Sequence, residues 1–282
     1  MAHFSKVYSA QTVGLSARII NVETDITKNT LQAFSVVGLP DKAVEESRDR
    51  VSAAIKNTKF TSPKNINYKT IISLAPSDLK KEGPLFDVAM AIGYLVADNK
   101  IFFDTDDKIF LGELSLNGEL RPIKGILVLV KEAKKHGFKE VYLPKENARE
   151  GALIEGIDIF GIHSLSELIG HLDAKSEKMN KNIIPRKITP EKHTVISYKD
   201  SDIKIDFSDI REQESAKRGL EIAAAGGHNI AMYGPPGTGK TMLAKAFVNI
   251  LPKMSFEDML EVTEIASIVG TLKDTLITNT PF

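Results

Sequence analysis

The chain of 282 residues is long enough for two domains, and its 42% hydrophobic and 26% charged residues are ordinary for a globular protein, so disorder is not expected. It carries 37 Lys and Arg residues and 37 Asp and Glu residues, which excludes a basic field over the whole chain, so any binding of nucleic acid needs a local patch or several copies. The absence of Cys excludes disulfides, Cys-ligated zinc sites and thiol nucleophiles.

Residues 1–14 mix polar groups with single apolar residues and lack the apolar stretch of a signal peptide. The apolar run over residues 126–130 is far too short to span a bilayer. We therefore expect a cytoplasmic protein without a membrane partner.

Residues 1–173 alternate short strands with helices. Strand-favouring residues between turn residues predict strands over 16–23, 32–37, 67–74 and 140–143. Apolar residues at helical spacing predict helices over 42–57, 86–97, 126–136 and 166–172. Asn117-Gly118 predicts a hairpin turn between strands at 109–114 and 119–123. Together these elements predict an α+β domain.

The composition changes at residue 174. Between residues 174 and 199, seven Lys or Arg residues face two Glu residues, and Pro185 and Pro190 interrupt any helix. This composition indicates a solvated basic linker over 174–205, and a local contact with nucleic acid stays open as the alternative. A second domain is expected from residue 206, beginning with a helix over 210–225.

The strongest motif is Gly234-Pro235-Pro236-Gly237-Thr238-Gly239-Lys240-Thr241, which fits the phosphate-binding pattern G-x-x-x-x-G-K-[ST]. Residues 228–233 before it read as a short buried strand, and residues 242–251 after it have one apolar helical stripe. A strand before this loop and a helix after it are the context that the motif requires.

The residue types of this loop suit a triphosphate. Glycines at 234, 237 and 239 let consecutive N–H groups face one point at a helix N-terminus, where an anion is favoured. Lys240 is expected to reach the β- and γ-phosphates of ATP, and the Thr241 hydroxyl to join the shell of a Mg²⁺ ion. The predicted cofactors are therefore ATP and Mg²⁺.

Further runs flank this loop and occur in the first half of the chain. They are Val36-Val37-Gly38-Leu39-Pro40-Asp41, Glu46-Ser47-Arg48-Asp49-Arg50-Val51, Leu74-Ala75-Pro76-Ser77-Asp78, Asp206-Phe207-Ser208-Asp209-Ile210 and Glu221-Ile222-Ala223-Ala224-Ala225-Gly226-Gly227-His228-Asn229. With the loop, they resemble the magnesium-chelatase-like AAA+ ATPases, most closely those of the ComM/YifB type, over essentially the whole chain.

The resemblance implies a Lon-protease-like domain (ribosomal S5-like fold) over 1–173 and the first part of an α/β P-loop AAA+ domain over 206–282. It also implies a hexamer-forming ATPase that acts on DNA, as a motor extending branched recombination intermediates in natural transformation.

Two departures qualify these implications. Glu212 stands where the family usually has Gly, near the expected adenine pocket. The sequence ends at Phe282 before an acidic Walker B strand, sensors or an arginine finger, so we expect a truncated ATPase domain with weak nucleotide binding and essentially no turnover. The alternative is a non-enzymatic interaction domain.

The resemblance also implies where a Lon-type peptidase site would lie, but the nucleophile and the base are missing there. Leu85 occupies the position of the Ser nucleophile, and the Lys base position falls on Leu127, with Leu129 two residues further on. Neither Leu can supply a nucleophile or accept a proton, so no catalytic residue is expected. For Asp78 and Asp87 we expect capping and surface ion pairs. The six His residues are scattered without metal-ligand spacing.

Overall fold

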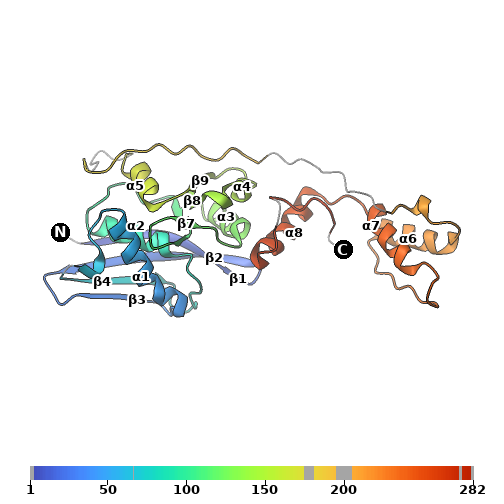
Figure 1. Ribbon diagram of the computed structural model, residues 1–282, viewed down its shortest axis with the longest axis horizontal. Helices are drawn as coiled ribbons and strands as arrows, with labels where there is room; N and C mark the ends of the chain where they lie inside the picture. Colours follow the sequence, from blue (N-terminus) through green and yellow to red (C-terminus); the bar gives the residue numbers. More distant parts are fainter. Residues whose placement is uncertain (1–2, 66, 175–180, 195–204, 273–274, 281–282) are drawn as a thin grey trace. The chain divides into compact units, whose positions relative to one another are not determined.

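The computed structural model describes the chain except residues 1–2, 66, 175–180, 195–204, 273–274 and 281–282. The chain forms two compact units (Figure 1). The first comprises Met1–Val195 and Glu264–Thr271, and the second comprises Ile196–Thr263 and Leu272–Phe282. Each unit is described in turn.

A seven-stranded sheet forms the centre of the first unit, in the order β3-β4-β2-β1-β5-β8-β9. The pairs β1–β2 and β2–β4 are antiparallel, and the other neighbours are parallel. The unit is thus a mixed α/β structure with a largely parallel sheet. Its strands are β1 (Phe4–Val13), β2 (Ser16–Lys28), β3 (Ala33–Val37), β4 (Tyr68–Ala75), β5 (Lys108–Phe110), β8 (Glu140–Pro144) and β9 (Asp158–Ile162).

Helices cover both faces of this sheet. One core cluster joins α1, α2 and α5 to the face that carries the stacked rings of Phe110, Tyr142 and Phe160. On the other face a Cβ at Gly151 would lie 3.2 Å from the Leu143 side chain, which places α4 there. The helices are α1 (Lys42–Asn57), α2 (Asp87–Ala97), α3 (Ile126–Lys135), α4 (Ala148–Gly151) and α5 (Leu165–Asp173), with 3₁₀ turns η1 (Pro63–Asn65) and η2 (Lys145–Asn147).

Strand β1 is central to the sheet, yet its sequence does not alternate apolar and polar residues. Its inward positions include Ser5, Ser9 and Gln11, each 5% exposed or less. Their polar atoms are satisfied by backbone oxygens: Ser5 Oγ donates to Gly93 O at 2.7 Å and Ser9 Oγ to Phe110 O at 2.9 Å. Because hydrogen bonds replace apolar contacts here, the hydrophobic pattern gives no strand signal.

The predicted Asn-Gly hairpin is confirmed. Strand β6 (Glu113–Leu114) pairs with β7 (Leu120–Arg121) in an antiparallel ladder. Gly118 in the turn has φ +87°, a conformation that glycine adopts without strain. The strand predicted before this turn is shorter and separate, because β5 joins the main sheet.

Within the expected linker over 174–205, residues 181–194, hereafter the strap, belong to the first unit and contact its sheet and core (Figure 1). The Glu191 N–H donates to Ile159 O at 2.7 Å, along the sheet-edge strand β9. The Ile183 side chain is 9% exposed and joins the core. Residues 175–180 and 195–204 lie outside the described part of the chain.

The second unit is helical in its described residues. It contains η3 (Phe207–Asp209), α6 (Glu214–Gly226) and α7 (Lys240–Ile250), while α8 (Phe256–Val269) begins in this unit and contributes its residues from Glu264 onwards to the first. A small core of Ile210, Leu220 and Phe247 with neighbouring alanines joins α6 to α7. In the described residues of the chain, no helix is both long and apolar enough to cross a membrane.

The strand predicted over 228–233 is wrong. These residues have no strand assignment, and Tyr233 in this stretch is fully exposed. A strand needs a hydrogen-bonded neighbour, and the described residues of the second unit form no other strand that could pair with it.

Candidate functional site

The predicted phosphate-binding residues lie between α6 and α7. Helix α6 ends at Gly226 and is capped by Gly227, which has φ +62°. The loop then runs to Gly239, the N-cap of α7, and Lys240 is the first residue of that helix. The Leu243 N–H donates to Gly239 O at 2.9 Å and closes the first helical turn. The structure thus gathers residues 234–241 at a helix N-terminus.

The loop glycines are needed for their backbone conformation. Gly237 and Gly239 have φ +84° and +82°, in the left-handed region. A Cβ at either position would meet no atom within 4 Å, so conformation and not space disfavours other residues there. These two positions turn the chain into the first turn of α7, whose N–H groups have no partner within the helix.

Lys240 folds back onto the loop. Its Nζ donates to Gly234 O at 2.8 Å and to Pro235 O at 2.6 Å, and it lies 3.3 Å from Thr238 Oγ1. Thr238 Oγ1 itself donates to Pro235 O at 3.0 Å. The amine is therefore held inside the loop by one part-buried and one exposed carbonyl, which an incoming anion can replace.

The residues present fit a triphosphate with its metal ion. A helix N-terminus and a Lys ammonium supply positive potential, and the exposed hydroxyl of Thr241 is an oxygen ligand of the kind that Mg²⁺ takes. This donor set can hold phosphate oxygens and one ligand position of a hard cation.

The departure at Glu212 has a conformational meaning. Glu212 has φ +57° and Gln213, the N-cap of α6, has φ +62°. Two consecutive left-handed residues cost free energy for side chains other than Gly. A Gly at residue 212 would adopt this conformation without that cost.

The two positions expected for a nucleophile and a base are apolar and packed in the first unit. Leu127 is fully buried in the first turn of α3. Leu85 is partly buried against the core, and its carbonyl accepts the Gly112 N–H at 3.0 Å. Both side chains therefore serve packing.

The expectation of a surface ion pair is wrong for Asp87. Its side chain has no solvent exposure, and both carboxylate oxygens accept from Arg50, Nε at 2.8 Å and Nη2 at 3.2 Å. Burial opposes the charge of Arg50, yet the hydrogen bonds and charge of Asp87 raise the Arg50 pKa above its ordinary value. The pair joins α1 to α2 in the interior.

A buried amine near the expected peptidase segment had no signal in the sequence. Lys81 has no solvent exposure, and its Nζ donates to Leu79 O at 2.7 Å and to Pro76 O. Burial lowers the pKa of Lys81, while the charge of Asp78 acts in the opposite direction. Because the Lys81 amine donates to these two backbone carbonyls, Lys81 holds the loop after β4 in place.

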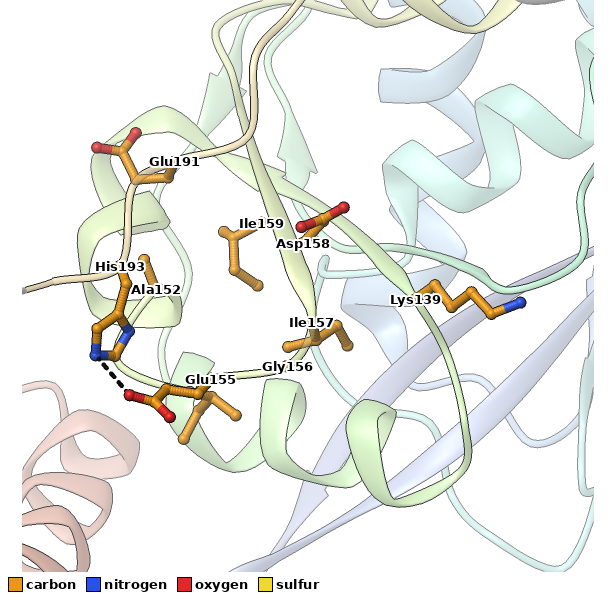
Figure 2. A pocket seen from close by; sticks show the side chains of 10 residues that line it. Lys139, Ala152, Glu155, Gly156, Ile157, Asp158, Ile159, Glu191 and His193 are labelled. Atoms are coloured by element: carbon orange, nitrogen blue, oxygen red, sulfur yellow. Dashed lines mark ion pairs between the residues drawn. The ribbon is translucent and has the colours of Figure 1, made fainter.

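A hollow of about 560 Å³ lies between the strap and the end of β9 (Figure 2). At its rim His193 Nε2 and Glu155 Oε1 point toward each other at 3.2 Å. Glu191 pairs with Lys145 at 2.7 Å and Lys139 with Asp107 at 2.5 Å. Among the described residues, no three His, Cys, Asp or Glu side chains are grouped to hold a metal ion. Because these charged side chains are paired with one another or with nearby protein groups, we assign no ligand to the hollow.

Comparison with known proteins gives two family matches. The family described as "Subunit ChlI of Mg-chelatase" matches residues 22–147, and the family described as "Magnesium chelatase, subunit ChlI" matches residues 206–282. The second match contains the whole phosphate-binding loop.

Individual relatives extend this likeness over nearly the whole chain. Competence protein ComM of Haemophilus influenzae is 34% identical over 264 residues, which cover 93% of this chain and 50% of the relative. Protein YifB of Escherichia coli is 38% identical over 267 residues, 94% of this chain and 49% of the relative. The chain thus spans about half the length of these curated relatives.

A more distant likeness covers less of the chain. Lon protease 2 of Bacillus subtilis is 28% identical over 172 residues, 56% of this chain and 30% of the relative.

Proposed function

The chain belongs to the magnesium-chelatase-like family, with relatives of the ComM/YifB type, and we propose that it binds ATP and Mg²⁺ through residues 234–241 as part of an AAA+ ATPase. AAA+ ATPases generally use ATP and Mg²⁺. The observation that carries the proposal is the loop itself, with two left-handed glycines and the amine of Lys240 at the N-terminus of α7.

Each residue of the loop contributes to binding the phosphates or the metal ion in this proposal. Gly234, Pro235, Pro236, Gly237, Thr238 and Gly239 form the curved backbone around the phosphates. Lys240 exchanges its bonds to Gly234 O and Pro235 O for phosphate oxygens, and Thr241 offers its hydroxyl to Mg²⁺. The metal ion, when bound, neutralises charge on the β- and γ-phosphates.

For the first unit we propose a Lon-protease-like fold (ribosomal S5-like) without peptidase activity. The likeness to Lon protease 2 supports the fold, and the apolar Leu85 and Leu127 support the loss of chemistry. Cleavage of casein by this chain, abolished by a substitution in the first unit, would contradict the second part.

For the whole protein we propose assembly into a hexamer that acts on DNA in the cytoplasm during recombination. The resemblance of the chain to ComM-type proteins supports this role, and the name of the Haemophilus relative, competence protein ComM, links that protein to competence. Because the net charge of the chain is zero, DNA contacts would be weak in one copy and would add up in a ring.

The ATP proposal is tested by titrating a fluorescent ATP analogue with Mg²⁺ into wild type and Lys240→Ala. A hydrogen bond to a charged group contributes about 1.5–3 kcal/mol, so we expect an affinity loss of roughly ten- to a hundred-fold. Lys245→Ala is the matched control, because Lys245 is an exposed Lys in the same helix. Equal affinity for wild type and Lys240→Ala would refute the assignment.

A further inference from the structure

Residues Glu264–Thr271 follow the phosphate-binding loop in the sequence but belong to the first unit. They contact the corner formed by α3 and α4, hereafter the α3–α4 corner. Lys131 Nζ on α3 lies 2.7 Å from Glu264 Oε1. The Gly125 N–H, directly before α3, donates to Ser267 O at 3.2 Å.

A half-buried carboxylate from α4 is central to this contact. Glu150 Oε1 accepts a hydrogen bond from the hydroxyl of Ser267. Ser267 is 4% exposed, so its hydroxyl needs a partner inside the protein. One carboxylate thus ties α8 to α4.

The backbone at this corner is shaped for close approach. Gly125 has φ +74°, and a Cβ there would lie 2.8 Å from Thr12 Cγ2 and 3.6 Å from Ile268 Cγ1. Helix α8 ends at Val269, whose carbonyl accepts Lys124 Nζ at 3.2 Å. A Lys at the carboxyl end of a helix also interacts favourably with the helix dipole.

The strap, which precedes the second unit in the sequence, contacts the same corner through Thr194. The Thr194 N–H donates to Ala152 O at 3.1 Å, and Thr194 Oγ1 donates to Arg149 O at 2.7 Å. Thr194 therefore contacts α4 just before residue 195, and Ser267 contacts α4 again much later in the sequence.

We propose that residues 264–271 are an intramolecular docking segment for the α3–α4 corner, with Glu150 as the anchoring group. Thr194 binds the same corner, so two segments far apart in the sequence meet at α4. Ion pairing between Lys131 and Glu264, the Ser267 hydroxyl and the Gly125 N–H select this segment. The inference does not depend on nucleotide binding.

Zero-length carbodiimide cross-linking of the 282-residue chain tests the proposal, because this reagent joins a paired amine and carboxylate. We expect a Lys131–Glu264 cross-link in peptide mass spectrometry. Lys139 and Asp107, 2.5 Å apart and both within the first unit, provide the internal control. An equal mixture of isotopically light and heavy chains distinguishes a link within one chain from a link between two copies.

Ser267→Asp places a second carboxylate against Glu150, so we expect loss of most of the Lys131–Glu264 link while the Lys139–Asp107 link persists. Ser166→Asp, on the exposed side of α5, is the matched control and should leave both links unchanged. The proposal is overturned if the Lys139–Asp107 link forms without a Lys131–Glu264 link. It is also overturned if the latter joins light to heavy chains, or if Ser267→Asp does not reduce it.

Discussion

In the first unit Lys81 and Asp87 lie fully buried, whereas in the second unit Lys240 is half-buried and donates to carbonyls of a surface loop. Both Lys residues donate to backbone carbonyls. The Lys81 side chain has no solvent exposure, whereas Lys240 is half-buried in a loop that solvent reaches. We therefore infer a structural role for Lys81 and propose a ligand-binding role for Lys240 from the solvent exposure of their surroundings, since their hydrogen bonds are alike.

The amount of secondary structure around each site adds to this contrast. The first unit stabilises its charges with a seven-stranded sheet covered by helices on both faces. The second unit has one small apolar core between α6 and α7, and its loop glycines lie at the surface. Substitutions of charged residues should therefore affect stability in the first unit and ligand affinity in the second.

The largest effect is expected for Arg50→Met, which leaves the Asp87 carboxylate buried without its partner. Breaking a buried ion pair costs about 3–5 kcal/mol, so the first unit should unfold roughly 6–20 °C lower. Differential scanning calorimetry would measure this. Lys64→Met is the control, because the Lys64–Asp49 pair is 41% and 69% exposed and should cost about 1 kcal/mol or less. Equal shifts for both variants would contradict the contrast.

A smaller effect is expected for Gly239→Ala, which puts a side chain at φ +82°. The left-handed conformation costs about 1–2 kcal/mol, so ATP affinity should fall roughly 5- to 30-fold if binding needs this backbone. Gly219→Ala is the control, because Gly219 lies in the middle of α6 with nothing within 4 Å of its Cβ position. An unchanged affinity in Gly239→Ala would show that the loop binds nucleotide in another conformation.

The smallest effect concerns pH. Burial raises the pKa of Glu150, against the hydrogen bonds from Ser267 and Asn147. A raised carboxyl pKa in the folded state makes a contribution to stability that is full below the unfolded pKa of about 4.3 and is lost as pH rises through the folded pKa. Relative to wild type, Glu150→Gln should therefore gain stability from pH 4 towards pH 7 in urea unfolding. A relative loss over that range would show that the ionised form is the stabilising one.

Much of the first unit could be predicted from the sequence, because its apolar residues recur at helical and strand spacing. Helix α1 lies over 42–57 as predicted, and α2 and α3 differ from prediction only at an end. Strand β1 could not be predicted, since Ser5 and Ser9 take inward positions and bond to backbone oxygens. The spacing of apolar residues indicates which side chains are buried by apolar contacts, but it does not indicate polar side chains that are buried by hydrogen bonding.

The contacts of the strap could not be predicted for a related reason. Backbone groups make several of these contacts, such as the N–H groups of Glu191 and Thr194. Every residue type except Pro has such an N–H group, so the side-chain composition cannot predict these contacts. The motif at 234–241 could be recognised because its pattern has glycines and a Lys at fixed spacing, and its binding of nucleotide stays a prediction. The strand expected before it failed because strand pairing depends on neighbours that the local sequence does not specify.

Amide hydrogen exchange with and without ATP and Mg²⁺ tests most directly whether the loop binds nucleotide. We predict slower exchange in residues 237–241 of the wild-type chain, because their N–H groups gain phosphate oxygens as partners, and a smaller change in Lys240→Ala at a nucleotide concentration that just saturates wild type. Saturating nucleotide that leaves exchange in this segment unchanged, or that slows exchange only in the first unit, would contradict it.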